Sequence, residues 1–463
     1  MQPGPGVADV TRPPPRSSDP VADLAAGIGA GPDDVRGALV GVALAADGRL
    51  GLAAGPDRAW WTSADPLVVL PALVRDLGVR LTWWSARSVL PLVAGGLRVT
   101  ASWDVAATHR LVHGGHDGDP AVVWAVATGR LPDGRPRSGQ LDLLGGGADT
   151  GAGDEPVEPW APVRPDGYLR PGWAELGPPD GPAAAGWAAC ALQVAETHRA
   201  ALADDRAALL TAWSESAAEL LAVELELAGL PLDRDTATAL IAERVGPRPQ
   251  DAEQARAERA RRDAAVLDLL PGAEETDLRN PAQVRDLLTR IGIDVPDTRS
   301  WRLEPLRVSH PLVAALLAWR KAERIATTYG YGWLDRHVGP DGRLRGTWSG
   351  CDGAAGRMTA SAGLHNLPAE LRPAVAAEPG HVLVRADLGQ VEPRVLAAVS
   401  GDRAFAAAAA DADLYAPVAA RLGVGRPVAK VAVLAAMYGQ TSGAAGEALR
   451  GLERAYPVAM SYL

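Results

Sequence analysis

The sequence is poor in cysteine, in long apolar runs and in positive charge, and each shortage excludes a class of protein. Its 463 residues include two cysteines, Cys190 and Cys351, which form neither a metal-binding spacing nor a disulfide framework. No apolar run approaches the ~20 residues that a membrane helix needs, and the N-terminus lacks the basic segment and apolar core of a secretory signal. We therefore expect a cytoplasmic protein that does not contact membranes.

The net charge of −10 argues against non-specific adhesion to nucleic acid. It is compatible with a local basic channel, because binding depends on the charge of the contact surface rather than on the total. At about 100–200 residues per domain, the length predicts more than one domain.

Composition and periodicity divide the chain into five segments, which are residues 1–20, 21–130, 131–182, 183–343 and 344–463. The first is rich in Pro, Ser and Asp and is predicted to be disordered. The second predicts a small α/β domain, with two strands in Gly37–Gly55 around the turn Asp47-Gly48. The third is dense in Gly and Pro and predicts a linker. The fourth is helical in pattern, and the fifth carries two charged motifs.

Stop and start signals place several helices in the fourth segment. Thr211–Ala228 is rich in Ala, Leu and Glu and ends at Gly229, a helix stop. Asn280 and Pro281 predict an N-cap and a first helical residue. His310–Trp333 is a long amphipathic pattern and predicts one helix.

A lone acid, Asp387, follows the apolar run His381–Val384, which predicts a buried strand. A helical pattern then begins near Gln390 and ends at Ser400-Gly401-Asp402. A carboxylate between a strand and a helix is well placed to hold a divalent cation such as magnesium, which prefers oxygen ligands. An acid that only caps the helix is the simpler interpretation when this stretch is considered alone.

A second stretch, Arg426–Gly439, places two cations and an aromatic on one helix face. Its residues Arg426, Lys430, Leu434 and Tyr438 recur every fourth position. Such a face presents charge to a triphosphate and a flat surface to a base. An amphipathic helix with a solvated basic end has the same spacing, so spacing alone does not decide between the two.

Together the two stretches resemble motifs A and B of bacterial family A DNA polymerases, the DNA polymerase I type. The likeness continues in order along roughly the last half of the chain, at Gly229–Asp233, Trp319–Tyr329, Gly356–Ser361 and Gly363–Pro368. It implies a fold of class α/β plus α, with a degenerate exonuclease-like α/β domain followed by a right-hand polymerase. The fourth segment would be its helical thumb and the fifth a partial palm and fingers.

The resemblance assigns roles to individual residues. It makes Asp387 and Lys430 catalytic, and it places magnesium, two ions in a complete site, on Asp387 and the backbone of Leu388. The residues that it assigns to nucleotide binding are Arg426, Lys430, Leu434, Tyr438, Gln390, Glu392 and Tyr415. Those that it assigns to DNA are Arg357, His365, Asn366, Arg394, Arg320 and Arg324. Tyr415 replaces a phosphate-contacting His of the family or serves only in packing, and Arg320 and Arg324 are equally compatible with a solvated face.

The resemblance implies a monomer that binds primer–template DNA and deoxynucleoside triphosphates, in replication or repair. Departures from the family weaken this expectation. Leu434 replaces an aromatic residue and predicts weaker nucleotide binding. The sequence shows no motif C, which carries the second catalytic carboxylate in the family, so we expect a C-terminally incomplete polymerase of low activity. A non-catalytic DNA-binding remnant is the alternative.

The N-terminal domain also departs from the family. The acid pair of the form DxE is missing from Gly37–Leu44. Asp104 either matches a middle acid of the exonuclease or is a surface residue. We expect weak or absent proofreading, and a nuclease that uses this domain is a third, less favoured function.

Overall fold

The computed structural model describes residues 12–28, 35–135, 158–352, 356–439 and 444–463. The chain forms two compact units that divide between Ala376 and Ala377. None of the described helices is both long enough and apolar enough to span a membrane.

The first unit begins with a five-stranded sheet in the order β3-β2-β1-β4-β5. Its strands are β1 (Leu39–Leu44), β2 (Leu50–Gly55), β3 (Arg58–Thr62), β4 (Arg80–Trp83) and β5 (Ser102–Asp104). β1 pairs antiparallel with β2 and parallel with β4. The predicted hairpin is confirmed, and Gly48 in its turn has a φ of 84°, which glycine adopts without steric cost. The short strands β3 and β5 were not predicted.

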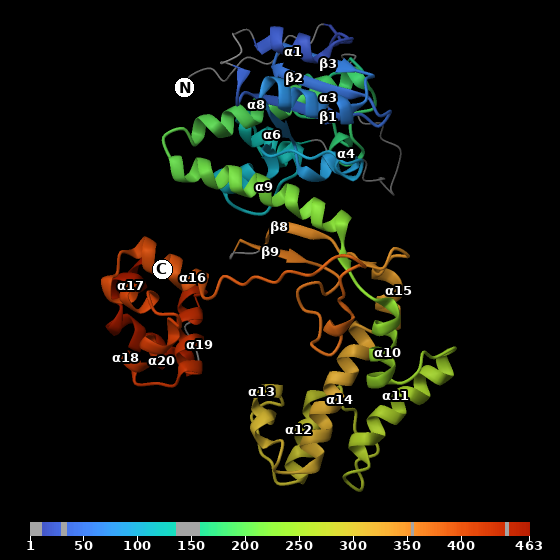
Figure 1. The fold of residues 1–463 in the computed structure, drawn as a ribbon, viewed down its shortest axis with the longest axis vertical. Helices are drawn as coiled ribbons and strands as arrows, with labels where there is room; N and C mark the ends of the chain where they lie inside the picture. The colour runs from blue at the N-terminus through green and yellow to red at the C-terminus, as the bar shows by residue number, and fades with distance from the viewer. Residues whose placement is uncertain (1–11, 29–34, 136–157, 353–355, 440–443) are drawn as a thin grey trace. The chain divides into compact units, whose positions relative to one another are not determined.

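Helices cover both faces of this sheet (Figure 1). They are α1 (Pro20–Ile28), α3 (Pro66–Ala72), α4 (Leu90–Ala94), α5 (Val105–His113), α6 (Pro120–Ala127), α8 (Gly181–Ala201) and α9 (Arg206–Ala228). Alternate residues of β1 enter two cores: Leu39 and Ala43 pack with α8, whereas Val40 and Val42 pack with α1 and α3. The alternation follows from the pleat of the strand.

The helix α8 lies so close to the sheet that glycine is required beneath it. A Cβ on Gly41 would lie 2.2 Å from the carbonyl oxygen of Ala188, and one on Gly51 would lie 2.2 Å from the backbone carbon of Ala184. The alanine-rich face of α8 therefore belongs to the sheet domain. The domain boundary drawn from composition after residue 182 falls inside this core.

The remaining helices of the first unit surround two further cores. They are α10 (Arg234–Val245), α11 (Ala252–Leu267), α12 (Pro281–Arg290), α13 (Ser300–Leu303), α14 (Pro311–Thr328) and α15 (Tyr331–His337), whereas α7 (Trp173–Leu176) packs on the sheet domain through Trp173. The cap at Asn280 is confirmed, because its side chain accepts a hydrogen bond from the amide of Ala282 at 3.0 Å. The stop at Gly229 is confirmed as well. The long helix predicted over His310–Trp333 is instead broken at Gly330, which separates α14 from α15.

Two short two-stranded sheets complete the first unit. β6 (Leu230–Pro231) pairs with β7 (Arg343–Leu344), and β8 (Trp348–Asp352) pairs with β9 (Arg357–Ala360). The second unit consists of α16 (Val391–Ser400), α17 (Arg403–Ala409), α18 (Tyr415–Leu422), α19 (Arg426–Met437), α20 (Ala444–Ala455) and α21 (Pro457–Tyr462). Its core includes Phe405 and Tyr456, whose rings are 5.1 Å apart.

The prediction of a strand at His381–Val384 is wrong. These residues lie outside any strand or helix, and Val382 and Val384 are 82% and 88% exposed. No strand pairs with them among the described residues of the second unit. A strand satisfies its backbone N–H and C=O groups only through a neighbour, so the apolar run has nothing against which to form one.

Two predictions about irregular segments are only partly tested. Of the segment expected to be disordered, residues 12–20 pack on β3, where the amide of Ser17 donates to the carbonyl of Trp61 at 2.8 Å. Residues 1–11 lie outside the described residues. Of the linker expected at residues 131–182, residues 136–157 also lie outside them, and the later part contributes the buried Leu169 to the sheet domain.

Candidate functional site

Asp413 joins the two motif stretches within the second unit. Its carboxylate accepts bonds from Arg426 Nε at 2.5 Å and Nη2 at 3.1 Å. It also accepts a bond from the side-chain amide of Gln390 at 2.8 Å, and Gln390 Oε1 in turn accepts from the amide of Leu414 at 2.8 Å. The hydrogen bonds from Arg426 hold the pKa of Asp413 below its ordinary value, so the carboxylate stays charged.

A second hydrogen bond links the start of α16 to the C-terminal end of α19. The hydroxyl of Tyr438, which caps α19, donates to Glu392 in the first turn of α16 at 2.7 Å. The stretch at Gln390 and Glu392 is thus connected to α19 at both of its ends. The predicted helix over Arg426–Gly439 is confirmed as α19.

Gln390 adopts a backbone conformation that is rare for a residue with a side chain. Its φ is 58° and its ψ is 36°, in the left-handed region. Such a conformation costs about 1–3 kcal/mol and persists only where surrounding contacts impose it. The hydrogen bonds that the side-chain amide of Gln390 makes with Asp413 and with the backbone amide of Leu414 are such contacts.

Lys430 and Leu434 follow Arg426 on the same face of α19. Lys430 is exposed, and no ion pair is found for it within the described part of the chain. Leu434 is half-buried and Tyr438 is 40% exposed. The face therefore presents one free ammonium group between a paired guanidinium and an aromatic ring.

Asp387 lies in the exposed segment before α16, and Leu388 beside it is 77% exposed. Groups of three or more His, Cys, Asp or Glu side chains that are close enough to share a cation were sought among the described residues. Asp387 belongs to no such group. One exposed carboxylate suits a hard cation that keeps its waters, but it does not by itself form a two-ion site.

In the first unit, the residues assigned to DNA gather around the end of α14. The carbonyl of Asn366 accepts bonds from Arg324 at 3.2 Å and from the Tyr329 hydroxyl at 3.1 Å. His365 Nε2 accepts a bond from the amide of Ala360 at 2.6 Å. A pocket of about 310 Å³ lies here, and its charged or polar lining includes Lys321, Arg324, His365, Asn366, Glu370 and Arg372. Arg357 is exposed on β9.

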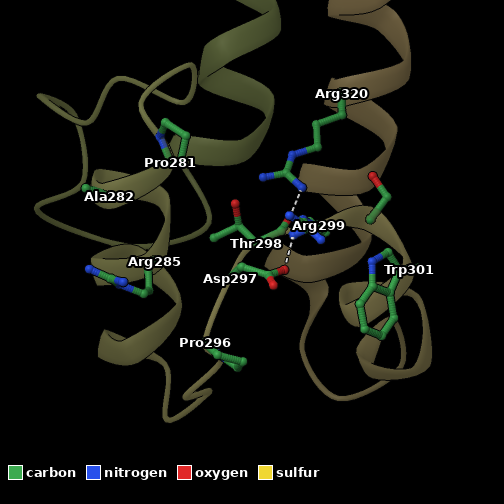
Figure 2. A pocket seen from close by; sticks show the side chains of 10 residues that line it. Pro281, Ala282, Arg285, Pro296, Asp297, Thr298, Arg299, Trp301 and Arg320 are labelled. Carbon is green, nitrogen blue, oxygen red and sulfur yellow. Dashed lines mark hydrogen bonds between the residues drawn. The ribbon is translucent and has the colours of Figure 1, made fainter. Parts of the chain in front are cut away.

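Arg320 does not join this group. Its guanidinium donates to the carbonyl of Thr298, and it lines a different pocket of about 710 Å³ together with Arg285 and Trp301. Figure 2 shows the side chain reaching from α14 across this pocket. Arg320 and Arg324 are therefore separate features, although they were assigned together.

Parts of this chain are similar to known DNA polymerases. A family model described as DNA polymerase family A matches residues 251–455. DNA polymerase I of Chloroflexus aurantiacus is 34% identical over 169 residues, which cover 33% of this chain and 18% of the relative. The thermostable DNA polymerase I of Thermus filiformis is 38% identical over 113 residues, which cover 23% of this chain and 13% of the relative.

Residues 251–455 thus resemble DNA polymerase family A. The matched stretches span less than a fifth of the length of these curated relatives. A solved structure, the POL domain of Pol1 from M. smegmatis in complex with DNA primer-template and dNTP, superimposes with a TM-score of 0.62. The superposition covers 97% of this chain and 77% of that one at 20% identity, and it shows a similar fold.

Arg394 and Tyr415, which were predicted to bind DNA and nucleotide, also have contacts inside the second unit. Arg394 donates to the carbonyls of Gly389, Ala409, Asp411 and Ala412. Tyr415 is 4% exposed within the core of the second unit. Their contacts agree with support and with packing, and their contact with DNA or nucleotide stays a prediction.

Sequence reasoning on the family motifs missed the role of Asp413. An acid that precedes a helix and lies between two motifs was the available signal, but the pairing with Arg426 joins residues 13 positions apart and has no local pattern.

Asp104 is not a surface residue, and within the described parts of the chain it belongs to no group of three or more side chains that could hold a metal ion. It is 1% exposed, and its carboxylate caps α5 by accepting a hydrogen bond from the backbone amide of Ala107 at 2.9 Å. The carboxylate also accepts a hydrogen bond from the backbone amide of Ala86 at 2.6 Å. Burial raises its pKa to about 7. Its contacts are those of a structural cap, and the expected loss of proofreading stays a prediction.

Proposed function

We propose that the chain supplies the nucleotide-binding and part of the DNA-binding surface of a template-directed DNA polymerase, acting in replication or repair. The observation that carries the proposal is the coupling of the two motif stretches through Asp413 and through Glu392–Tyr438. This coupling fixes one helix face on which a free ammonium lies between a guanidinium and an aromatic ring.

The residues of this face divide the work of nucleotide addition. Lys430 neutralises the triphosphate and donates a proton to the leaving pyrophosphate, as its exposed and unpaired ammonium allows. Arg426 adds positive charge while Asp413 fixes its orientation. Tyr438 provides a surface for the templating base, and Glu392, fixed by the Tyr438 hydroxyl, crowds a 2′-hydroxyl and so excludes ribonucleotides.

Asp387 supplies the oxygen ligand that Mg²⁺ prefers. Bound there, the ion would activate the primer 3′-oxygen and stabilise charge on the phosphates. A pair of ions needs at least two carboxylates, and the described residues gather no three-ligand group at Asp387. The residues present fit one ion that keeps waters and phosphate oxygens as its other ligands.

The group around α14 would bind primer–template DNA. Arg324, Lys321 and Arg372 bring positive charge to one pocket, and Arg357 is exposed on the adjoining hairpin. Contacts of this kind fix the register on a duplex without reading its sequence. We propose that the chain does this as a monomer.

A second function, DNA binding without catalysis, is favoured by the lone position of Asp387. The two are separated by primer extension with the four deoxynucleotides and Mg²⁺, together with the fluorescence anisotropy of a labelled primer–template. Polymerase function predicts extension that is abolished in Asp387→Ala and lowered about 10²-fold in kcat/KM in Lys430→Ala. Arg403→Ala, an exposed arginine on α17, is the matched control and keeps full activity.

The outcomes are distinct. No extension with unchanged primer–template binding would establish the second function for this chain. Extension that survives Asp387→Ala would refute the assignment of the metal ligand. An unaltered chain that neither extends nor binds the primer–template would refute both functions.

A further inference from the structure

Three histidines meet between α5 and α8 in the sheet domain, outside the region that the polymerase family model matches. His109 and His113 are one helical turn apart on α5, and His198 lies on α8. One ring nitrogen from each lies within 4.8 Å of the others. His109 is 4% and His198 0% exposed, whereas His113 is exposed.

The buried rings lack the partners that buried polar groups require. Both nitrogens of His198 and Nδ1 of His109 are buried without a hydrogen-bond partner among the described residues. An unsatisfied buried donor or acceptor costs about 1–3 kcal/mol. Such unpartnered atoms in one cluster call for a ligand that the protein atoms do not provide, and one ion would take one nitrogen from each ring.

We propose that His109, His113 and His198 bind one Zn²⁺ ion or a similar borderline divalent cation. Neutral imidazole suits Zn²⁺, Ni²⁺, Cu²⁺ or Co²⁺ and does not suit Mg²⁺. Two histidines at i and i+4 on one helix present their rings to the same point, as in zinc-binding helices. The three ring pairs have centroid separations of 4.6, 5.7 and 5.9 Å, so the rings already face one another.

Coordination requires only a small closure of the cluster. With Zn–N bonds of about 2.0–2.1 Å, tetrahedral ligand nitrogens lie about 3.3 Å apart, against the present limit of 4.8 Å. Rotation of the exposed His113 ring provides most of this closure. The fourth position is left to water or to the carboxylate of Asp117, which acts electrostatically on His109.

The ion would act as a clamp between α5 and α8. Both helices belong to the same core as β1 and β5, and a cation ligated from both stabilises the folded chain by its binding free energy. This site takes a different metal from the proposed polymerase site and uses none of its residues.

The test is a metal titration of the full chain after removal of metal by a chelator. Co²⁺ reports coordination by its ligand-field absorption, and Zn²⁺ is measured by displacing it. We expect one equivalent to bind, with affinity lowered at least tenfold in His113→Ala. His381→Ala, an exposed histidine of the second unit, is the control and leaves affinity unchanged.

The test uses His113→Ala because this variant is expected to retain the fold. His198→Ala removes a fully buried side chain and can destabilise the domain, whereas His113 is exposed and its substitution leaves the metal-free unfolding temperature unchanged. Zn²⁺ should raise the unfolding temperature of the unaltered chain and not that of His113→Ala. Absence of a one-equivalent site, or affinity equal in the unaltered chain and His113→Ala, would overturn the proposal.

Discussion

Two apolar runs of similar character, β1 and His381–Val384, have opposite fates in this molecule. β1 lies between β2 and β4, and its residues alternate between two buried cores. The second run lies outside any strand, with Val384 88% exposed. The runs differ in their partners rather than in their own composition.

The comparison shows which part of strand formation is local and which is not. Apolar β-branched residues favour a strand, but backbone pairing comes from segments far away in sequence. β1 obtains it from β4, about 40 residues later, and obtains cover from α8 because Gly41 permits the approach. The second run has neither pairing nor cover among the described residues.

The largest effect that would sharpen this comparison is expected from Gly41→Val. Its Cβ would meet the carbonyl oxygen of Ala188 at 2.2 Å, and backbone cannot move aside as a flexible side chain can. We expect a loss of about 3 kcal/mol or more in unfolding free energy, at or above the upper end of overpacking costs. All 14 tryptophans precede residue 349, so urea unfolding followed by tryptophan fluorescence reports on the first unit.

The control for this substitution is Gly332→Ala on α15. A Cβ at Gly332 meets nothing within 4 Å, so the variant should be as stable as the unaltered chain or slightly more so. Equal stabilities of Gly41→Val and Gly332→Ala would mean that α8 does not rest on β1.

The next effect is a pH dependence from Asp104, the buried last residue of β5 in the same sheet. Its pKa is about 7 in the folded chain, against about 3.9 when unfolded. Between these values the folded state binds the extra proton, so stability falls as pH rises, by about 1.4 kcal/mol per unit. From pH 5 to pH 7 we expect a loss of about 2–3 kcal/mol relative to Asp104→Asn, which lacks this titration.

The quantity to measure is the difference in unfolding free energy between the unaltered chain and Asp104→Asn at each pH. Burial lowers the pKa of His109 to about 4 and that of His198 to about 3. Stability from these groups falls as pH drops below about 6.5, which opposes the slope from Asp104. Subtracting the urea-unfolding profile of Asp104→Asn removes the histidine contribution, and a difference that stays flat from pH 5 to pH 7 would contradict the raised pKa.

Local signals explain what the sequence predicted correctly. The cap at Asn280, the stop at Gly229 and the hairpin turn at Gly48 each depend on a few adjacent residues, and the same holds for the helical spacing of α19. The ordered motifs indicated the family for the same reason.

Long-range pairing explains what the sequence did not show. Three features join residues from separate elements. They are the hydrogen bonds around Asp413, the packing of α8 on β1 and the histidine cluster. His109 and His113 have a readable spacing, but their third partner is about 85 positions away. The sheet domain was cut at residue 182 because α8 carries a helical pattern that does not reveal what it packs against.

The smallest effect is expected in the second run itself. Val384→Lys replaces a side chain that is 88% exposed, so its cost in unfolding free energy should be within about 0.5 kcal/mol. Hydrogen exchange measured on peptides from both units should show the amides of Val382–Val384 exchanging rapidly in both proteins, whereas those of Val40–Val42 are protected by ladder bonds. A lysine on an unpaired apolar run also disfavours edge-to-edge association, so the variant should aggregate less at high concentration. Slow exchange at Val382–Val384, lost in Val384→Lys, would show that this run finds a strand partner in solution, and the contrast with β1 would then disappear.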